Sequence, residues 1–379
     1  MNKSYINRIF TANMYIHKLK AWPNFTWDDK VLAEKLGRVN YGMGMVMGQM
    51  NAAGFKQKEE ALLKTLTLDV TKSSAIEGEM LNAEQVRSSI ARRLGIEFAG
   101  MVTSDRRTDG VVEMMLDATQ NFNLPLTADR LYGWHSALFP SGKSSLHNIT
   151  VGKWRNDETG PMQVVSGPLG REKVHYQAPD AKYLPDEMTA FLNWFNDEQP
   201  LNPVMKAGVA HLWFVTIHPF DDGNGRITRA ITDMQLARAD RSSQRFYSMS
   251  AQIEKERNSY YDILEQTQKG TLDITGWLIW FFDCLGWSMD NTMDVLEKVS
   301  LRSDFWDRHR DAALNSRQKK MVDNLLDDFY GTLNVSKWAK ITKSSTDTAL
   351  RDIRDLMGKG ILAQNEGGGR NTSYSIILT

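Results

Sequence analysis

The sequence predicts a mainly α-helical protein with one β-hairpin and a separate C-terminal module of helices and two short strands. Most of the 379 residues place apolar side chains at helical spacing. Strand-like runs gather in two places only, near residues 164–176 and 361–376. A chain of this length can form two or three domains, each with a substantial core. The expected parts are a helical region at 1–95, a central domain at 96–290, a helical linker at 291–315 and a C-terminal domain at 316–379.

Charge and cysteine content exclude several classes of protein. The 46 Lys and Arg residues balance 46 Asp and Glu residues, so no protein-wide field favours nucleic acid or membranes. The single cysteine, Cys284, excludes an internal disulfide framework, and its apolar neighbours predict a buried thiol. Residues 1–8 lack the apolar core of a secretion signal. The most hydrophobic stretch, 274–287, is interrupted by Asp283 and too short to span a bilayer. We therefore expect a cytoplasmic protein that does not bind membranes.

The N-terminal region is expected to end in an amphipathic helix. Residues 59–71 carry leucines and a valine on one side. Ser73 and Glu77 follow four residues apart, which places them on one face near the end of the helix. Taken alone, Glu77 is an ordinary solvated carboxylate before a C-terminal glycine cap at Gly78. The methionines between residues 43 and 50 are expected to be adaptable packing and not a cofactor site.

The run of residues 164–176 is expected to form a β-hairpin. Short apolar segments flank a turn that contains Gly167 and Pro168. Val174 and His175 lie on its second strand. His175 is a candidate second base, although a surface histidine is the favoured interpretation.

The run His-Pro-Phe-Asp-Asp-Gly-Asn-Gly-Arg-Ile-Thr-Arg at 218–229 carries the strongest chemical signal. The apolar helix expected at 204–217 would deliver His218 to its start. An unperturbed imidazole titrates near neutral pH, as a general base requires. Asp222 offers hard oxygen ligands suited to Mg²⁺.

Glycines and arginines complete this run. Gly223 and Gly225 permit a close backbone approach, and amides at the start of the following helix form an anion-binding nest. Arg226 and Arg229 are three residues apart, so both project from one face of that helix. Each residue alone has a structural explanation, such as a simple turn before a helix. Together they predict a site that handles a polyphosphate.

The run resembles the signature of the Fic family, His-x-Phe-x-(Asp/Glu)-Gly-Asn-Gly-(Arg/Lys)-x-x-Arg, and fills every defined position. The resemblance implies a Fic-type helical bundle that transfers AMP from ATP to a hydroxyl of a target protein, which can be the chain itself. His218 would take the proton of a Ser, Thr or Tyr hydroxyl, and Phe220 would anchor the loop. Arginine at position 226 favours AMP transfer over branches that transfer phosphate. The residues implied in nucleotide binding are Asp222, which also holds Mg²⁺, Gly223, Asn224, whose side chain orients the phosphates, Gly225, Arg226 and Arg229.

Residues 73–78 resemble the inhibitory motif of the same family, (Ser/Thr)-x-x-x-Glu-(Gly/Asn). The resemblance implies that Ser73, Glu77 and Gly78 form a self-inhibitory segment. Glu77 would pair with Arg229 and exclude the productive pose of ATP. Some relatives use this glutamate to position a water that removes AMP, so removal by the same enzyme is a further expectation.

Two other segments fit the family more loosely. The hairpin with Val174 and His175 corresponds to a flap that receives the target segment by strand addition. Tyr260 and Tyr261 lie where the family binds adenine, but packing is the favoured interpretation of a tyrosine pair. The chain departs from the pattern at Ala178, where a proline is common, and at Gln268, where asparagine is common.

The C-terminal domain resembles a winged helix-turn-helix. Helices are expected at 318–329 and 344–358, followed by two strands around a glycine run at 367–369. The N-cap candidates of the second helix are Ser344, Ser345 and Thr346. Arg351 and Arg354 could face DNA. Three aspartates on the same helix, Asp347, Asp352 and Asp355, dilute this charge. Docking of protein and dimer formation are the alternatives.

Two classes of function therefore remain. The leading one is a self-inhibited protein adenylyltransferase that needs ATP and Mg²⁺. The alternative is a DNA-binding regulator whose Fic domain only senses nucleotide, although a pure sensor would not need His218 as a base. Transfer of another nucleotide or of a phosphate group, the target protein and homodimer formation stay open.

Overall fold

The computed structural model describes residues 15–52, 54–97, 100–144, 147–158, 160–168, 170–198, 200–326, 329, 331–366 and 372–378. The expectations about residues 1–8 and the glycine run 367–369 lie outside these ranges. The chain divides into two compact units, Met1–Thr292 and Met293–Thr379. Both are mostly helical with small antiparallel strand pairs, which confirms the predicted fold class.

The N-terminal part of the Met1–Thr292 unit consists mainly of helices. They are η1 (Ile16–Lys18), α2 (Asp29–Ala52), α3 (Phe55–Ile76) and α4 (Ala83–Leu94). Met43 and Met50 of α2 are buried, in agreement with a packing role. Helix α3 ends at Ile76 because Glu77 caps it and Gly78 takes a left-handed φ of 81°. A glycine adopts that conformation without strain.

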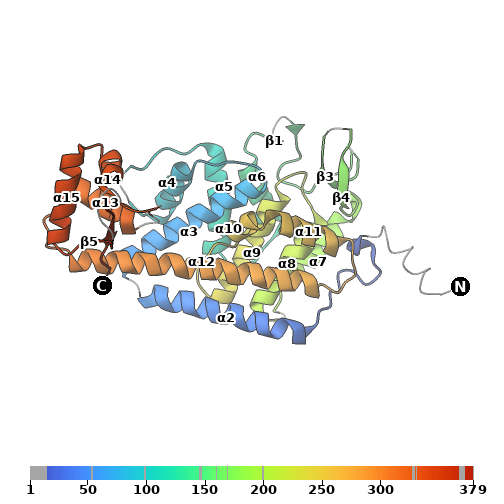
Figure 1. Ribbon diagram of the computed structural model, residues 1–379. Helices are drawn as coiled ribbons and strands as arrows, with labels where there is room; N and C mark the ends of the chain where they lie inside the picture. Colours follow the sequence, from blue (N-terminus) through green and yellow to red (C-terminus); the bar gives the residue numbers. More distant parts are fainter. Residues whose placement is uncertain are drawn as a thin grey trace. The chain divides into compact units, whose positions relative to one another are not determined.

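The central helices of this unit include two buried helices, α8 and α9, that pack against each other. The central helices are α5 (Arg106–Gln120), α6 (Ala128–Leu138), α7 (Leu184–Asn196), α8 (Pro203–Ile217), α9 (Asn224–Asp240), α10 (Met249–Lys255), α11 (Arg257–Gln268) and α12 (Thr275–Arg308). Helix α8 is buried from Val204 to Ile217, as expected for a helix that is apolar on all sides. Helix α9 packs against α8 and also contacts α3, α5 and α6 (Figure 1).

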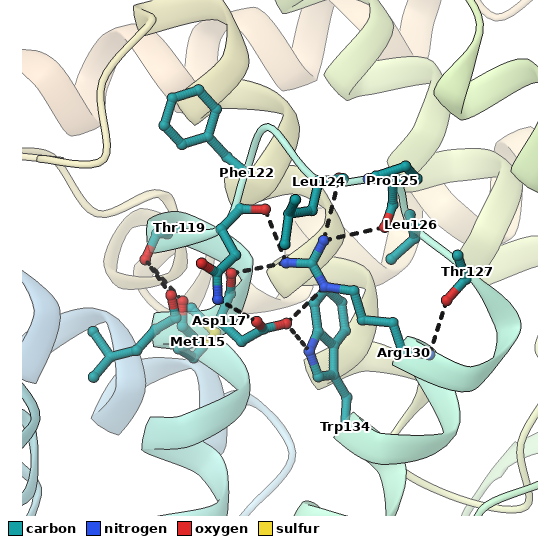
Figure 2. A network of polar contacts seen from close by, with 12 residues as sticks. Met115, Asp117, Thr119, Phe122, Leu124, Pro125, Leu126, Thr127, Arg130 and Trp134 are labelled. Atoms are coloured by element: carbon teal, nitrogen blue, oxygen red, sulfur yellow. Dashed lines mark hydrogen bonds and ion pairs between the residues drawn. The ribbon is translucent and has the colours of Figure 1, made fainter.

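A polar network fixes α5 to α6, which flank α9 (Figure 2). Arg130 of α6 donates from Nε to Asp117 Oδ2 of α5 at 2.7 Å, and Trp134 Nε1 donates to the same oxygen at 2.7 Å. Arg130 also donates to the carbonyl oxygens of Leu124 and Pro125 in the loop between the two helices. These hydrogen bonds therefore hold the loop between α5 and α6 in one conformation.

Two short antiparallel pairs complete the unit. Strands β1 (Lys143–Ser144) and β2 (His147–Asn148) form the first. Strands β3 (Gln163–Ser166) and β4 (Lys173–Gln177) form the predicted hairpin, with a bulge between Val164 and Val165. A 3-10 turn, η2 (Ala181–Tyr183), leads into α7.

The cysteine and the hydrophobic stretch singled out in the sequence both lie in or next to α12. Cys284 is fully buried and unpaired, as the sequence predicts. No helix in the part of the chain that the structure describes combines the length and the apolar character needed to cross a bilayer.

The Met293–Thr379 unit has its own core. Its helices after α12 are α13 (Ser316–Leu326), α14 (Val335–Thr342) and α15 (Thr346–Gly358), and its strands β5 (Leu362–Gln364) and β6 (Tyr374–Ile376) pair antiparallel. Trp338, Ile353 and Leu356 are among its fully buried residues. Ser345 caps α15 by accepting the Thr348 N–H. The likeness of this unit to a winged helix stays a prediction.

Candidate active site

His218 stands at the sharp turn between α8 and α9. Its φ and ψ of 52° and 58° are left-handed, and its N–H still donates to Phe214 O at 3.0 Å. The ring Nδ1 lies 3.2 Å from Val215 O, which can only accept, so Nδ1 carries the proton and Nε2 keeps its lone pair. Burial, and then the nearby Arg155, lower the pKa of His218 to about 4. The ring is therefore neutral at pH 7 and can accept a proton.

Two buried residues hold the loop after His218. Arg155 donates from Nε to His218 O at 2.8 Å and from its backbone N–H to Pro219 O at 2.9 Å. Phe220 is fully buried, and its ring stacks on His135 with centroids 4.3 Å apart. Phe220 thus occupies the anchoring position expected of it. Arg155 belongs to no motif, so sequence reasoning missed its role.

Asn224 is turned toward the loop and not toward the place of a ligand. Its Oδ1 accepts the Phe220 N–H at 3.0 Å, and its Nδ2 donates to Phe220 O at 2.7 Å. The residue is 1% exposed. Both of its polar atoms bond the backbone of the loop, and a role of this side chain in orienting phosphates stays a prediction.

Asp222 and Gly223 form the turn into α9. Asp222 accepts the Gly223 N–H on Oδ1 at 2.6 Å and the Ser144 hydroxyl on Oδ2. Its side chain stays 43% exposed, which leaves lone pairs open to a cation. Gly223 has a φ of 80°, and a Cβ there would lie 2.9 Å from the Phe139 ring, so only glycine fits. No group of three metal-ligating side chains occurs among the described residues.

Arg226 and Arg229 are almost completely buried, at 1% and 2% exposure. Arg226 Nη1 donates to Glu79 Oε2 at 2.6 Å. Arg229 donates from Nε to Ser73 Oγ at 2.9 Å and from Nη2 to Ser73 O and Glu77 Oε1, both at 2.8 Å. Within the described ranges, Arg226 Nε and Arg229 Nη1 have no acceptor. The contact between Glu77 and Arg229 that the family resemblance implies is present, whereas sequence reasoning missed Glu79.

Glu77 also fills the space beside Gly225. A Cβ built on Gly225 would lie 2.0 Å from Glu77 Oε1 and 3.2 Å from Arg229 Nη1. The carboxylate therefore lies against the backbone of the first turn of α9, where backbone N–H groups and the helix dipole favour an anion.

The two tyrosines occupy different environments. Tyr260 is 2% exposed, and its hydroxyl lies 2.9 Å from His211 Nε2 in the core. This burial agrees with the packing interpretation favoured from the sequence, and a role in nucleotide binding stays a prediction. Tyr261 is 37% exposed, and its hydroxyl donates to Ile76 O at 3.4 Å, so it lies beside the end of α3. Gln268 is buried and donates to Thr216 Oγ1 at 3.3 Å.

Each strand of the hairpin presents an exposed valine, Val165 on β3 at 47% exposure and Val174 on β4. Val174 on β4 is 38% exposed. Both ring nitrogens of His175 are engaged, Nδ1 with Glu265 Oε2 at 2.5 Å and Nε2 with Ser166 Oγ at 2.6 Å. His175 therefore fixes the strand to α11, and the favoured interpretation of a non-catalytic histidine agrees with this geometry.

Two parts of the chain match known protein families. Residues 15–96 match a domain of unknown function, DUF4172, and residues 125–236 match the Fic/DOC family. Over 178 residues the chain is 28% identical to protein adenylyltransferase fic-1 of Caenorhabditis elegans, covering 46% of this chain and 32% of that protein. Over 105 residues it is 35% identical to protein adenylyltransferase Fic of Culex quinquefasciatus, covering 27% and 19%. The chain thus spans a third or less of the length of these relatives.

A solved structure supports the same assignment at the level of the fold. A Fic family protein from Desulfovibrio desulfuricans G20 matches 94% of this chain and 98% of its own, with a TM-score of 0.53 and 17% identity. At this identity the likeness shows a shared fold and nothing finer. Together with the complete motif at 218–229, these matches show that the chain carries a domain of the Fic/DOC family.

Proposed function

We propose that this protein is an adenylyltransferase that moves AMP from ATP to a Ser, Thr or Tyr hydroxyl of a target protein or of itself. One observation carries the proposal. Two buried guanidinium groups, Arg226 and Arg229, each keep an N–H without an acceptor among the described residues, close to the neutral His218. Buried donors of this kind fit the oxygens of a polyphosphate, which guanidinium groups bind with charge-assisted hydrogen bonds. The relatives of the Fic domain that are named protein adenylyltransferases agree with this chemistry.

The mechanism follows from these positions. His218 Nε2 takes the proton of the target hydroxyl, and the hydroxyl oxygen forms a bond to the α-phosphorus of ATP. The bond from the α-phosphorus to the bridging oxygen breaks, and pyrophosphate leaves with that electron pair. Arg226 and Arg229 stabilise the negative charge on the departing phosphates. Because the protein forms no covalent bond to the nucleotide, catalysis consists of positioning and charge stabilisation.

Asp222 is the residue that would hold Mg²⁺. It is a partly exposed carboxylate fixed by Ser144 and by the Gly223 N–H. Mg²⁺ in nucleotide sites is commonly held by one or two carboxylates together with substrate phosphates, so one aspartate fits this requirement. The ion would supply positive charge that offsets the charge of the phosphates.

Glu77 is proposed to inhibit this activity from within the chain. Its carboxylate occupies Arg229 and the space beside Gly225, which the polyphosphate needs. ATP must therefore displace Glu77 to bind productively. The same position makes Glu77 a candidate for orienting water during AMP removal. The exposed Val174 on β4 supports docking of an extended target segment by strand addition.

Labelling with ATP marked on the α-phosphate tests the proposal. Purified wild type, Glu77→Gly, Glu77→Gln and His218→Ala are incubated with Mg²⁺, with and without a cell lysate as a source of targets. We expect strong protein labelling by Glu77→Gly and weak labelling by wild type. Glu77→Gln should be intermediate, because it keeps a hydrogen bond but loses the charge. His218→Ala should give none. An unlabelled Glu77→Gly would exclude AMP transfer, and label only from the γ-phosphate would indicate phosphate transfer.

A second candidate function, nucleic-acid binding, is favoured by the Met293–Thr379 unit. Asp352 is 5% exposed and accepts from Arg317 Nε at 2.8 Å, and Asp355 accepts from Gln318 Nε2 at 2.7 Å. Asp352 is thus neutralised by Arg317, whereas the more exposed Asp355 pairs with Lys359 at the end of the same helix. Arg351 and Arg354 remain exposed, and no partner for either is found within the described part of the unit. A regulator of this kind would bind nucleic acid without labelling protein.

A further inference from the structure

Glu79 places a second carboxylate in the candidate site. It lies two residues beyond Glu77, and its N–H donates to Ser74 O at 3.0 Å, so the chain between them folds back onto the end of α3. Its Oε2 accepts from Arg226 Nη1 at 2.6 Å, and its Oε1 pairs with Arg107 of α5. The side chain of Glu79 is only 20% exposed.

Arg226 has little freedom to avoid this contact. Its side chain is 1% exposed, and its guanidinium lies over the Phe139 ring at 5.1 Å. A ligand that uses Arg226 must therefore reach the guanidinium where it is and compete with Glu79. Each arginine of the motif is thus matched with one carboxylate from the segment after α3, Arg229 with Glu77 and Arg226 with Glu79.

We propose that Glu79 is a second inhibitory carboxylate, which occupies Arg226 in the place of a phosphate group of the nucleotide. This inference rests on the proposed function. Arg107 gives Glu79 a second cation on the exposed side, with 53% of the Arg107 side chain exposed. When a phosphate takes Arg226, Glu79 stays paired with Arg107, so its displacement does not leave a carboxylate without a counter-ion. Inhibition then consists of two separable ion pairs.

Binding measurements in a His218→Ala background, where no turnover occurs, test this proposal. The probes are ATP, inorganic tripolyphosphate and adenosine, measured by calorimetry. We expect Glu79→Gln to bind ATP and tripolyphosphate about tenfold more tightly, because a competing charge-assisted hydrogen bond is lost. Adenosine has no phosphate, so its affinity should not change. Glu84→Gln, on the exposed first turn of α4, is the matched control and should leave all three affinities unchanged.

Arg107→Gln provides a second and independent variant, because the exposed Arg107 can be removed without disturbing the core. It should weaken binding of ATP, since Glu79 then has only Arg226 as a partner. The double variant Glu79→Gln with Arg107→Gln should bind as tightly as Glu79→Gln, because Arg107 acts only through Glu79. A double variant that binds more weakly would show that Arg107 contacts the phosphates itself and would contradict this part of the proposal.

The two proposals fail in different ways. Unchanged or weaker binding of tripolyphosphate by Glu79→Gln would overturn the inhibitory role of Glu79 and indicate that it orients Arg226. Labelling of protein by Glu77→Gly would still support AMP transfer in that case. Tighter binding of tripolyphosphate by Glu79→Gln, combined with no protein labelling by Glu77→Gly, would support Glu79 as a competitor for anions and reject the transferase.

Discussion

At the scale of single residues, the shape of the active-site loop depends on a few buried polar groups. A left-handed conformation is uncommon for a residue with a side chain, yet His218 adopts it with a φ of 52°. Arg155 binds its carbonyl oxygen, and Asn224 binds both backbone groups of Phe220 two residues later. The orientation of His218, the proposed base, therefore depends on side chains outside the proposed reaction centre.

Asn224→Ala should damage both stability and activity. The substitution leaves the buried N–H and C=O of Phe220 without partners, so the free energy of unfolding should fall by about 2 kcal/mol. Labelling in the Glu77→Gly background should fall as well, because the loop no longer holds His218. Urea unfolding and α-phosphate labelling would measure the two effects. Asn258→Ala on the exposed surface of α11 is the control. Equal stability of the two variants would contradict the role assigned to Asn224.

The sequence predicts the residues of the motif but not their partners. The motif is contiguous, so the spacing of Arg226 and Arg229 on one helix already indicates a shared anion. The contacts from Glu79 to Arg226, from Arg155 to His218 and from Ser144 to Asp222 join residues 147, 63 and 78 positions apart. No local pattern links such positions, so only the packing of α3, α5 and the loops against α9 reveals them.

At the scale of elements, periodicity predicts which helices are buried but not how charges on one helix are distributed. Helix α8 is apolar on all sides, and its complete burial follows from that. Helix α15 carries two arginines and three aspartates, and the sequence alone suggests that the aspartates dilute the positive charge. In the structure Asp352 is buried against Arg317, while Arg351 and Arg354 are exposed. The distribution of charge over the surface of α15 therefore depends on α13, because Arg317 of α13 pairs with Asp352.

The exposed arginines of α15 should determine any binding of nucleic acid. If the second candidate function holds, the variant with both Arg351→Ala and Arg354→Ala should bind duplex DNA more weakly. The slope of log affinity against log salt should also fall by about 2, since each phosphate contact contributes about 0.9. Fluorescence anisotropy at several salt concentrations would measure it. Lys319→Ala with Lys320→Ala on α13 removes the same charge from another helix, and an equal effect would argue for non-specific attraction only.

At the scale of the whole molecule, the Met1–Thr292 unit holds several histidines in a neutral form. Burial, and then the nearby Arg229, lower the pKa of His211 to about 3. Burial also lowers the pKa of His135 to about 4 and that of His17 to about 4. An unfolded histidine has a pKa near 6.5, so the unfolded chain binds more protons in the interval between these values. The stability that these residues contribute is present above pH 6.5 and is lost as the pH falls toward 4.

His211→Gln isolates one such contribution. We expect wild type to be more stable than the variant at pH 7, because Gln cannot reproduce both the Thr232 and the Tyr260 contacts of the ring. This difference should shrink by about 2 kcal/mol between pH 7 and pH 5, because protonation of the unfolded wild-type histidine then favours unfolding. Chemical unfolding at the two pH values measures the change. A difference that is constant with pH would show that His211 is not held neutral in the folded unit.

The pairing of two arginines with two carboxylates also has a consequence for how activity can be switched on. Moving the segment after α3 away would leave Arg229 without its carboxylate and Arg226 with only the more distant Asp222, and incompletely compensated buried charges are unfavourable. An empty site with this segment displaced is therefore unfavourable. If the proposed inhibition holds, release is an exchange of anions, in which the nucleotide brings the negative charge that Glu77 and Glu79 give up. The nucleotide would then act as the counter-ion of Arg226 and Arg229 in place of the two carboxylates.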